Sequence, residues 1–69
     1  MSLDAQIMHL LTIIPGGTAE DIADDLTSLS GELVTQRAVQ DRLHAMDDDG
    51  RVLMRNGFYR LSEAERART

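Results

Sequence analysis

Residues 52–61, VLMRNGFYRL, contain the feature that most restricts what this chain can fold into. The Asn56-Gly57 pair favours a two-residue type I′ turn, because both central positions of that turn need a positive φ. A four-residue run that suits a strand lies on each side of the pair. We therefore predict a two-stranded β-hairpin over residues 52–61.

Alternation along the two predicted strands divides their side chains between two faces. Folding about the turn gives the register Val52–Leu61, Leu53–Arg60, Met54–Tyr59 and Arg55–Phe58. The face expected to meet the core holds Val52, Met54, Tyr59 and Leu61. The outer face holds Leu53, Arg55, Phe58 and Arg60. For Phe58 two interpretations stay open: its ring folds over the core edge, or it is exposed at the hairpin tip.

Three helices are predicted before the hairpin, each beginning at a hydroxyl residue that can cap its first turn. These caps are Ser2, Thr18 and Thr35, and the expected helices span about 2–13, 18–28 and 35–48. Pro15 and the two glycines after it separate the first helix from the second. Gly50 suits the position just beyond the end of the third helix.

Two further segments complete the expected fold. Residues 27–33, TSLSGEL, form a polar connection, and Leu33-Val34 is a candidate for a very short strand. Ser62 is a possible cap for a short or frayed C-terminal helix over 62–69. The chain has no repeat or linker, so residues 1–69 are expected to form one domain. Its predicted class is α+β, mainly helical.

The 69 residues carry a net charge of −5 that is unevenly distributed. Residues 1–34 contain six acidic and no basic residues. Residues 35–69 contain six acidic residues and seven arginines, a net of +1, and the chain has no lysine. Arginine suits phosphate oxygens and guanine edges. The basic part of the chain is therefore the candidate for contact with nucleic acid.

The composition of the chain excludes or disfavours several other classes of function. The chain has no cysteine, which excludes a disulfide scaffold and a thiolate metal site. No apolar run reaches the roughly 18–20 residues that span a bilayer, and no signal peptide is expected, which predicts a cytoplasmic protein without membrane contact. No catalytic triad or phosphate-binding loop is evident. We expect a non-enzymatic protein without metal or cofactor.

Three stretches carry a resemblance to a known superfamily. They are TAEDIADDL, VTQRAVQDRLHAMDDDGRV and the hairpin that ends in FYRLS. Residues 22–61, which contain most of them, resemble the winged helix-turn-helix superfamily of small bacterial and phage DNA-binding regulators. The resemblance implies a three-helix fold with a C-terminal two-stranded β-hairpin wing.

The resemblance also implies a DNA-binding site. The helix at 35–48 would be the recognition helix in the major groove, and the 52–61 hairpin would be the wing. The residues expected to contact DNA are Thr35, Gln36, Arg37, Gln40, Asp41, His44, Arg55, Asn56, Phe58 and Arg60. Gln pairs well with adenine and Arg with guanine. Asp41 would either accept a hydrogen bond from cytosine or pair with Arg37 one turn earlier.

Two functions follow as hypotheses. The first is sequence-specific binding of double-stranded DNA in transcription regulation, with a homodimer on paired half-sites. The second is a protein-interaction module of the same fold, whose acidic N-terminal half binds a basic protein partner. A positive surface joining the third helix to the hairpin would favour the first, and a negative surface there the second.

Overall fold

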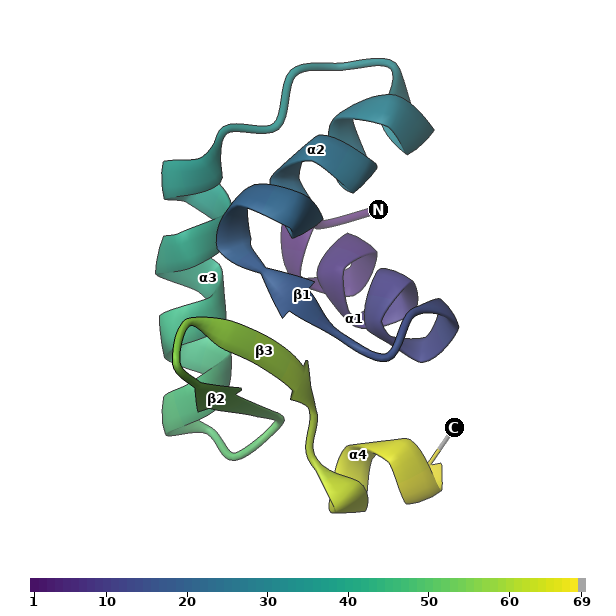
Figure 1. Cartoon of the computed structure of the whole chain (residues 1–69). Helices are drawn as coiled ribbons and strands as arrows, with labels where there is room; N and C mark the ends of the chain where they lie inside the picture. Colours follow the sequence, from purple (N-terminus) through teal and green to yellow (C-terminus); the bar gives the residue numbers. More distant parts are fainter. Residues whose placement is uncertain (69) are drawn as a thin grey trace.

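The computed structural model describes residues 1–68, which form four helices and a three-stranded antiparallel sheet (Figure 1). The elements in chain order are α1 (Leu3–Ile13), β1 (Gly17–Thr18), α2 (Ala19–Ser30), α3 (Gln36–Asp48), β2 (Val52–Arg55), β3 (Phe58–Leu61) and α4 (Glu63–Arg68). The predicted α+β, mainly helical class is confirmed. Residue 69, the last of the predicted C-terminal helix, lies outside the described residues.

Hydroxyl caps begin the first three helices, as predicted. The side chains of Ser2, Thr18 and Thr35 each accept a backbone N–H three residues on, at 3.1–3.2 Å. These bonds satisfy donors that the first turn of a helix leaves unpaired. Ser62 plays the same part for α4, accepting the N–H of Glu65 at 3.3 Å. The start of each helix therefore depends on a capping residue and its immediate neighbours in the sequence.

The end of α3 is a Schellman motif. Gly50 has φ +77°, its N–H donates to the carbonyl of Asp47 at 3.0 Å, and the N–H of Arg51 donates to that of Met46 at 2.9 Å. The predicted position of Gly50 beyond the helix end is confirmed. This motif turns the chain directly from α3 into β2.

The connection between α2 and α3 differs from the prediction. α2 continues to Ser30 and stops at Gly31, which adopts φ +75°. The short strand predicted at Leu33-Val34 is wrong. The Thr27 hydroxyl accepts the Val34 N–H at 2.9 Å and donates to the Val34 carbonyl at 3.2 Å. With both backbone groups of Val34 paired locally, no partner strand is needed there.

The sheet has one more strand than the predicted two-stranded wing. The hairpin register is confirmed at all four pairs, and Asn56 and Gly57 have φ +52° and +81° as a type I′ turn requires. However, β1 pairs with the other side of β3, giving the order β1-β3-β2. The hairpin is therefore joined to the helical body through the segment between α1 and α2.

Close approach at Gly16 explains how β1 reaches β3. A Cβ there would lie 2.5 Å from both Phe58 Cε1 and the carbonyl oxygen of Tyr59, and Gly16 has φ +149°. Only glycine fits both the space and the backbone angle. The Gly-Gly pair was predicted only as a helix break, but it also admits the third strand.

The core lies between α1, α2, α3 and the inner face of the sheet. It consists of Ile7, Leu10, Leu11, Ala19, Ile22, Ala23, Leu26, Val39, Leu43, Met46, Val52, Tyr59 and Leu61. Met54, predicted on this face, is 47% exposed. It lies on the edge strand beside the turn, where its Sδ accepts the Gly57 N–H at 3.4 Å. Tyr59, opposite Met54, lies on the central strand and is buried in the core cluster.

Within residues 1–68, no helix combines the length and the apolar character needed to cross a membrane.

Candidate nucleic-acid interface

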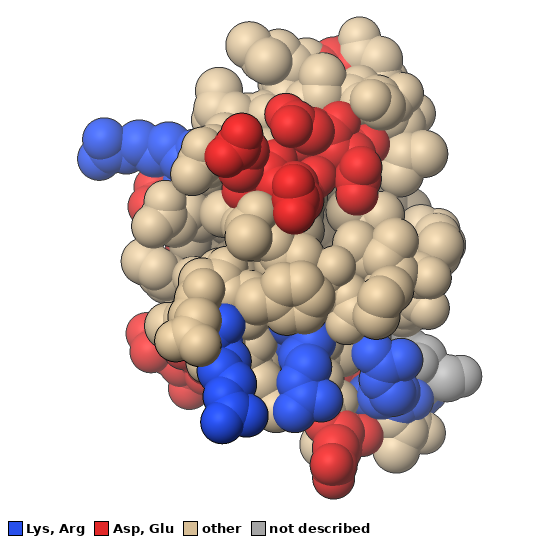
Figure 2. Space-filling model, viewed as in Figure 1, with Lys and Arg blue, Asp and Glu red and all other residues tan. Residues whose placement is uncertain are grey.

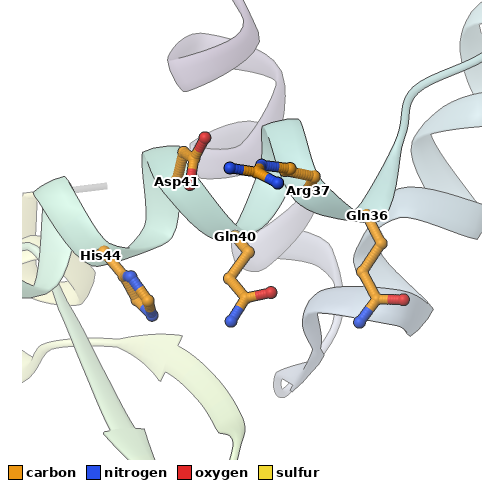
Figure 3. A pocket seen from close by; sticks show the side chains of 5 residues that line it. All are labelled: Gln36, Arg37, Gln40, Asp41 and His44. Carbon is orange, nitrogen blue, oxygen red and sulfur yellow. The ribbon is translucent and has the colours of Figure 1, made fainter.

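The exposed side of α3 carries five of the residues predicted to contact DNA. A single hollow on this surface is lined by Gln36, Arg37, Gln40, Asp41 and His44. Gln36, Gln40 and His44 follow one another at one-turn intervals and point to the same side of the helix (Figure 3). Because α3 buries Val39, Leu43 and Met46 on its other side, this polar row is held outward.

Arg37 and Asp41 lie beside the polar row, one turn apart (Figure 3). None of the ion pairs within residues 1–68 contains either side chain. The pairing considered from their spacing is therefore not formed. The Arg37 guanidinium and the Asp41 carboxylate are both exposed and able to meet an external ligand.

A groove connects α3 to the hairpin turn. Gln36 and Gln40 line it from α3, Gly57 from the turn, and Glu20 from the first turn of α2. A ligand along the α3 face would thus meet the tip of the hairpin on one side. It would also pass an acidic side chain, which sequence analysis did not place near the site.

The hairpin provides a second hollow. Its lining residues are Leu53, Met54, Arg55, Asn56, Phe58 and Arg60. All four predicted hairpin residues of the site are therefore together. Leu53 and Met54 were not predicted as site residues. Alternation already placed Leu53 on the outer face, whereas nothing in the local pattern indicated that Met54 is exposed.

Phe58 combines the two interpretations left open by its sequence position. Its ring lies against Gly16, the residue just before β1, as shown by the 2.5 Å separation between Phe58 Cε1 and the Cβ position of that glycine. The side chain nevertheless remains 44% exposed. One edge of the ring is packed against the sheet, and the rest is presented at the surface between β1 and β2.

Thr35 is placed differently from the other predicted contacts. Its hydroxyl oxygen accepts the Ala38 N–H at 3.2 Å and so caps α3. Its structural role is thus the first turn of the helix that carries the polar row. As a side-chain contact to DNA, Thr35 stays a prediction.

The arginines divide into two groups by their partners. Arg42 donates to both oxygens of Asp4, at 2.6 and 2.8 Å, and Arg51 pairs with Asp49 at 3.0 Å. Arg68 pairs with Glu65 at 3.0 Å. By contrast, within residues 1–68 no ion pair contains Arg37, Arg55 or Arg60. Among residues 1–68, the arginines that form no ion pair are therefore the three of the candidate site.

Hydrogen bonding has shifted two pKa values at the α1–α3 contact. The side-chain hydrogen bonds from Arg42 lower the pKa of Asp4 below its usual value, and the same bonds raise the pKa of Arg42. Both groups are held in their charged forms. This ion pair lies away from the α3 polar row and fastens the start of α1 to α3.

Figure 2 shows an uneven distribution of charge over one face. The largest group of acidic residues lies over α2, and a row of arginines lies below it over the hairpin and toward α4. One further arginine projects at the upper left, and other acidic residues lie at the lower edge. The exposed acidic residues of α2 are Glu20, Asp21, Asp24 and Asp25. The positive surface therefore does not run unbroken from α3 to the hairpin.

Among residues 1–68, no group of three or more His, Cys, Asp or Glu side chains is arranged to hold a metal ion. Comparison of the chain with protein-family models, with curated proteins and with solved structures found no match.

Proposed function

We propose that this protein binds double-stranded DNA as a small winged helix-turn-helix regulator. In this proposal α3 enters the major groove, and the β2–β3 hairpin is the wing that contacts the sugar–phosphate backbone. A major groove about 12 Å wide accepts a single α-helix with side chains of ordinary size. The outward row on α3 and the adjoining hairpin turn have the relative placement that such a contact needs.

The observation that carries the proposal is the distribution of unpaired arginines. Arg37, Arg55 and Arg60 are exposed, make no ion pair within residues 1–68, and come from the two elements that would touch DNA. Free guanidinium groups suit phosphates and guanine edges, because their donors form a planar fork. These three arginines supply positive charge on both elements despite the net charge of the protein, although Asp41 and Glu20 lie beside them and the positive surface is not continuous.

The chemistry of the α3 row supports sequence-specific contact. Gln36 and Gln40 each offer a donor and an acceptor, the pair that reads adenine in the major groove, and Arg37 suits guanine. Asp41 accepts hydrogen bonds only, as the cytosine amino group requires. A purely nonspecific binder would need cations along this helix, whereas the row is mostly neutral and polar.

The small number of unpaired arginines limits the affinity of a single copy for DNA. Three phosphate contacts predict a slope of about −3 for log K against log salt, at about −0.9 per contact. Regulators with 6–10 contacts have steeper slopes and tighter binding. Glu20 at the edge of the groove would also repel phosphate. Two copies on paired half-sites would double the number of phosphate contacts.

Selection of bound fragments from genomic duplex DNA tests the proposal directly. The selection is run at about 50 mM salt, and the selected duplex is then titrated at increasing salt. We expect a common sequence among the fragments and a slope near −3 for each bound chain. If the protein retains no duplex at low salt, or if binding does not respond to salt, DNA binding is wrong.

A second candidate function is docking of a basic protein partner on α2. It is favoured by Glu20, Asp21, Asp24 and Asp25, which are exposed and make no ion pair within residues 1–68. Simultaneous reversal of Asp21, Asp24 and Asp25 to Arg should abolish capture of such a partner. If all captured partners stay bound to the folded triple variant, the acidic surface is not their docking site.

A further inference from the structure

No helix or strand from residues 1–68 covers the outer face of the sheet. Side chains from all three strands lie side by side on this face. The register places Thr18 on β1, Phe58 on β3 and Arg55 on β2 side by side across the sheet. Arg60 and Leu53 form the next pair on this face, two residues further along the hairpin. Because α2 begins directly after Thr18, its acidic first turns adjoin the β1 edge of this face.

Crossing the sheet from β1 to β2 therefore leads from negative charge, over an exposed aromatic ring, to positive charge. Figure 2 shows the two charged groups on one side of the molecule, with an uncharged strip between them. Leu53 and Phe58 are 41% and 44% exposed, which is high for large apolar side chains on a sheet. Such a face, with opposite charges on either side of apolar groups, is complementary to its own copy.

We propose that a second copy of this chain covers this face in a two-fold symmetric dimer. The two-fold axis passes through the uncharged strip, so the hairpin of each copy lies against α2 of the other. Arg55 and Arg60 meet the partner's acidic cluster twice, once on each side of the axis. The Phe58 rings lie near the axis, giving the apolar centre and polar rim that are typical of interfaces.

Charge complementarity is the argument for a second copy as the occupant. The guanidinium groups of Arg55 and Arg60 and the four α2 carboxylates make no ion pairs within residues 1–68, so each set is available to the other. A two-fold arrangement satisfies both sets at once, without a second kind of protein. The net charge of −5 on each copy opposes association, which makes the dimer weak and sensitive to salt.

This dimer is separate from the DNA-binding proposal and does not rest on it. If both hold, they compete, because Arg55, Phe58 and Arg60 belong to both contacts. Dimer formation would then withhold the hairpin from DNA, and duplex binding would release the second copy. The dimer is thus distinct from one that holds two DNA-binding surfaces on paired half-sites.

Sedimentation equilibrium of the whole chain without DNA measures the association. We expect a monomer–dimer equilibrium at about 10 mM salt, where the Debye length is about 30 Å, and monomer at about 1 M salt, where it is about 3 Å. Two double variants separate the charges: Asp24→Arg with Asp25→Arg, and Arg55→Glu with Arg60→Glu. Each variant alone should raise the dimer dissociation constant at least about tenfold, because like charges then face each other.

An equimolar mixture of the two variants is the decisive measurement. The mixture restores opposite charges at both contacts, so a heterodimer should form at least as tightly as the wild-type dimer. The acid-reversed variant carries −1 and the arginine-reversed variant −9, because each substitution changes the charge by two units. Both are negative, so attraction between net charges does not explain a heterodimer.

The control pairs the arginine-reversed variant with Asp47→Arg and Asp48→Arg. This control also carries −1, but its new charges lie at the end of α3. One contact of its heterodimer keeps opposite charges, but the other sets Glu against the α2 acids, so this heterodimer should form more weakly than that of the two variants. Circular dichroism confirms that each variant is folded. A wild-type chain that stays monomeric at millimolar concentration and low salt overturns the proposal, as does a mixture in which the control associates equally well.

A parallel duplex titration keeps the two proposals distinguishable. Loss of DNA binding alone leaves the sedimentation result unchanged. Absence of the dimer alone leaves the salt-dependent duplex binding unchanged.

Discussion

The α1–α3 contact and the α3–hairpin surface use the same residue type in opposite ways. At the first, Arg42 donates two hydrogen bonds to Asp4, and Arg51 lies 4.0 Å from the same carboxylate. At the second, Arg37, Arg55 and Arg60 make no ion pair within residues 1–68. The first contact uses arginine to hold helices together, whereas the second leaves arginine available for a ligand.

The two regions also differ in how they are attached to the core. The α1–α3 contact adds an exposed ion pair to helices that already pack through buried side chains. The hairpin also packs through buried side chains, but it is held in addition by backbone pairing to β1 and by the close contact of Phe58 and Tyr59 with Gly16. Since backbone and shape hold the hairpin, its outer charges are not needed for stability. Substitutions should therefore separate stability from binding, region by region.

Gly16→Ala is expected to have the largest effect, because it breaks the attachment of the hairpin. The added Cβ would lie 2.5 Å from Phe58 Cε1 and the Tyr59 carbonyl oxygen, at a φ of +149°. Combined strain and overpacking should lower the free energy of unfolding by about 2–5 kcal/mol. A core of this size supplies on the order of 3–5 kcal/mol, so urea denaturation should show a chain that is largely unfolded.

Gly31→Ala is the matched control for that substitution. Gly31 has φ +75°, but nothing lies within 4 Å of the position of its Cβ. Only the backbone cost remains, about 1 kcal/mol. If the two variants lose equal stability, the contact with β3 is not what makes Gly16 necessary.

The third strand shows which features of the fold cannot be predicted from neighbouring residues alone. Caps at Ser2, Thr18 and Thr35 and the turn at Asn56-Gly57 were predictable, because each depends on a few adjacent residues. β1 depends on contact between segments about 40 residues apart, and its two residues are too short for an alternation pattern. The Gly-Gly pair was visible, but its second role depends on the position of Phe58.

The same holds for the candidate site: features that depend on local spacing were predictable, and those that depend on contacts between distant segments were not. Helical spacing placed Gln36, Gln40 and His44 on one face, and Figure 3 shows them there. Spacing did not reveal that Arg37 and Asp41 would stay unpaired, since their side chains have several rotamers. It also missed Glu20 beside the groove, because α2 and the hairpin turn meet only in the folded chain.

Arg37→Ala and Arg42→Ala should distinguish an arginine that binds DNA from an arginine that stabilises the fold. Arg37→Ala should weaken specific duplex binding by about 1–3 kcal/mol, or roughly 5–150-fold, with little change in stability. Arg42→Ala removes an arginine from the same helix that is bound to Asp4. It should leave specific affinity nearly unchanged and lower thermal stability slightly. Fluorescence anisotropy on the selected duplex measures the first effect, and equal losses of affinity would remove the distinction between the regions.

Arg55→Ala and Arg60→Ala should have smaller effects of a different kind. A contact to phosphate carries little sequence information, so each change should weaken all duplexes similarly. Each should also make the slope of log K against log salt shallower by about 1 unit. Anisotropy titrations at several salt concentrations give the slope. Arg68→Ala, which removes an arginine paired with Glu65 on α4, is the control and should keep the wild-type slope.

Asp4→Asn should have the smallest effect, and a pH series identifies it. The pKa of Asp4 in the folded chain lies below its usual value of 3.8, because Arg42 donates hydrogen bonds to the charged carboxylate. The contribution of Asp4 to stability is therefore present above about pH 4 and is lost as the pH falls through the lower, folded-state pKa. Asp4→Asn should be slightly less stable than wild type at neutral pH and should approach it in acid.

Thermal unfolding between about pH 6 and about pH 2.5 measures this convergence. Asp48→Asn, which removes an exposed carboxylate that is in no ion pair within residues 1–68, is the matched control. A constant difference between wild type and Asp4→Asn across that range would show that the ion pair does not stabilise the α1–α3 contact. The pairing of Arg42 would then not distinguish it from the unpaired arginines of the hairpin, and the proposed division of the arginines would lose its physical basis.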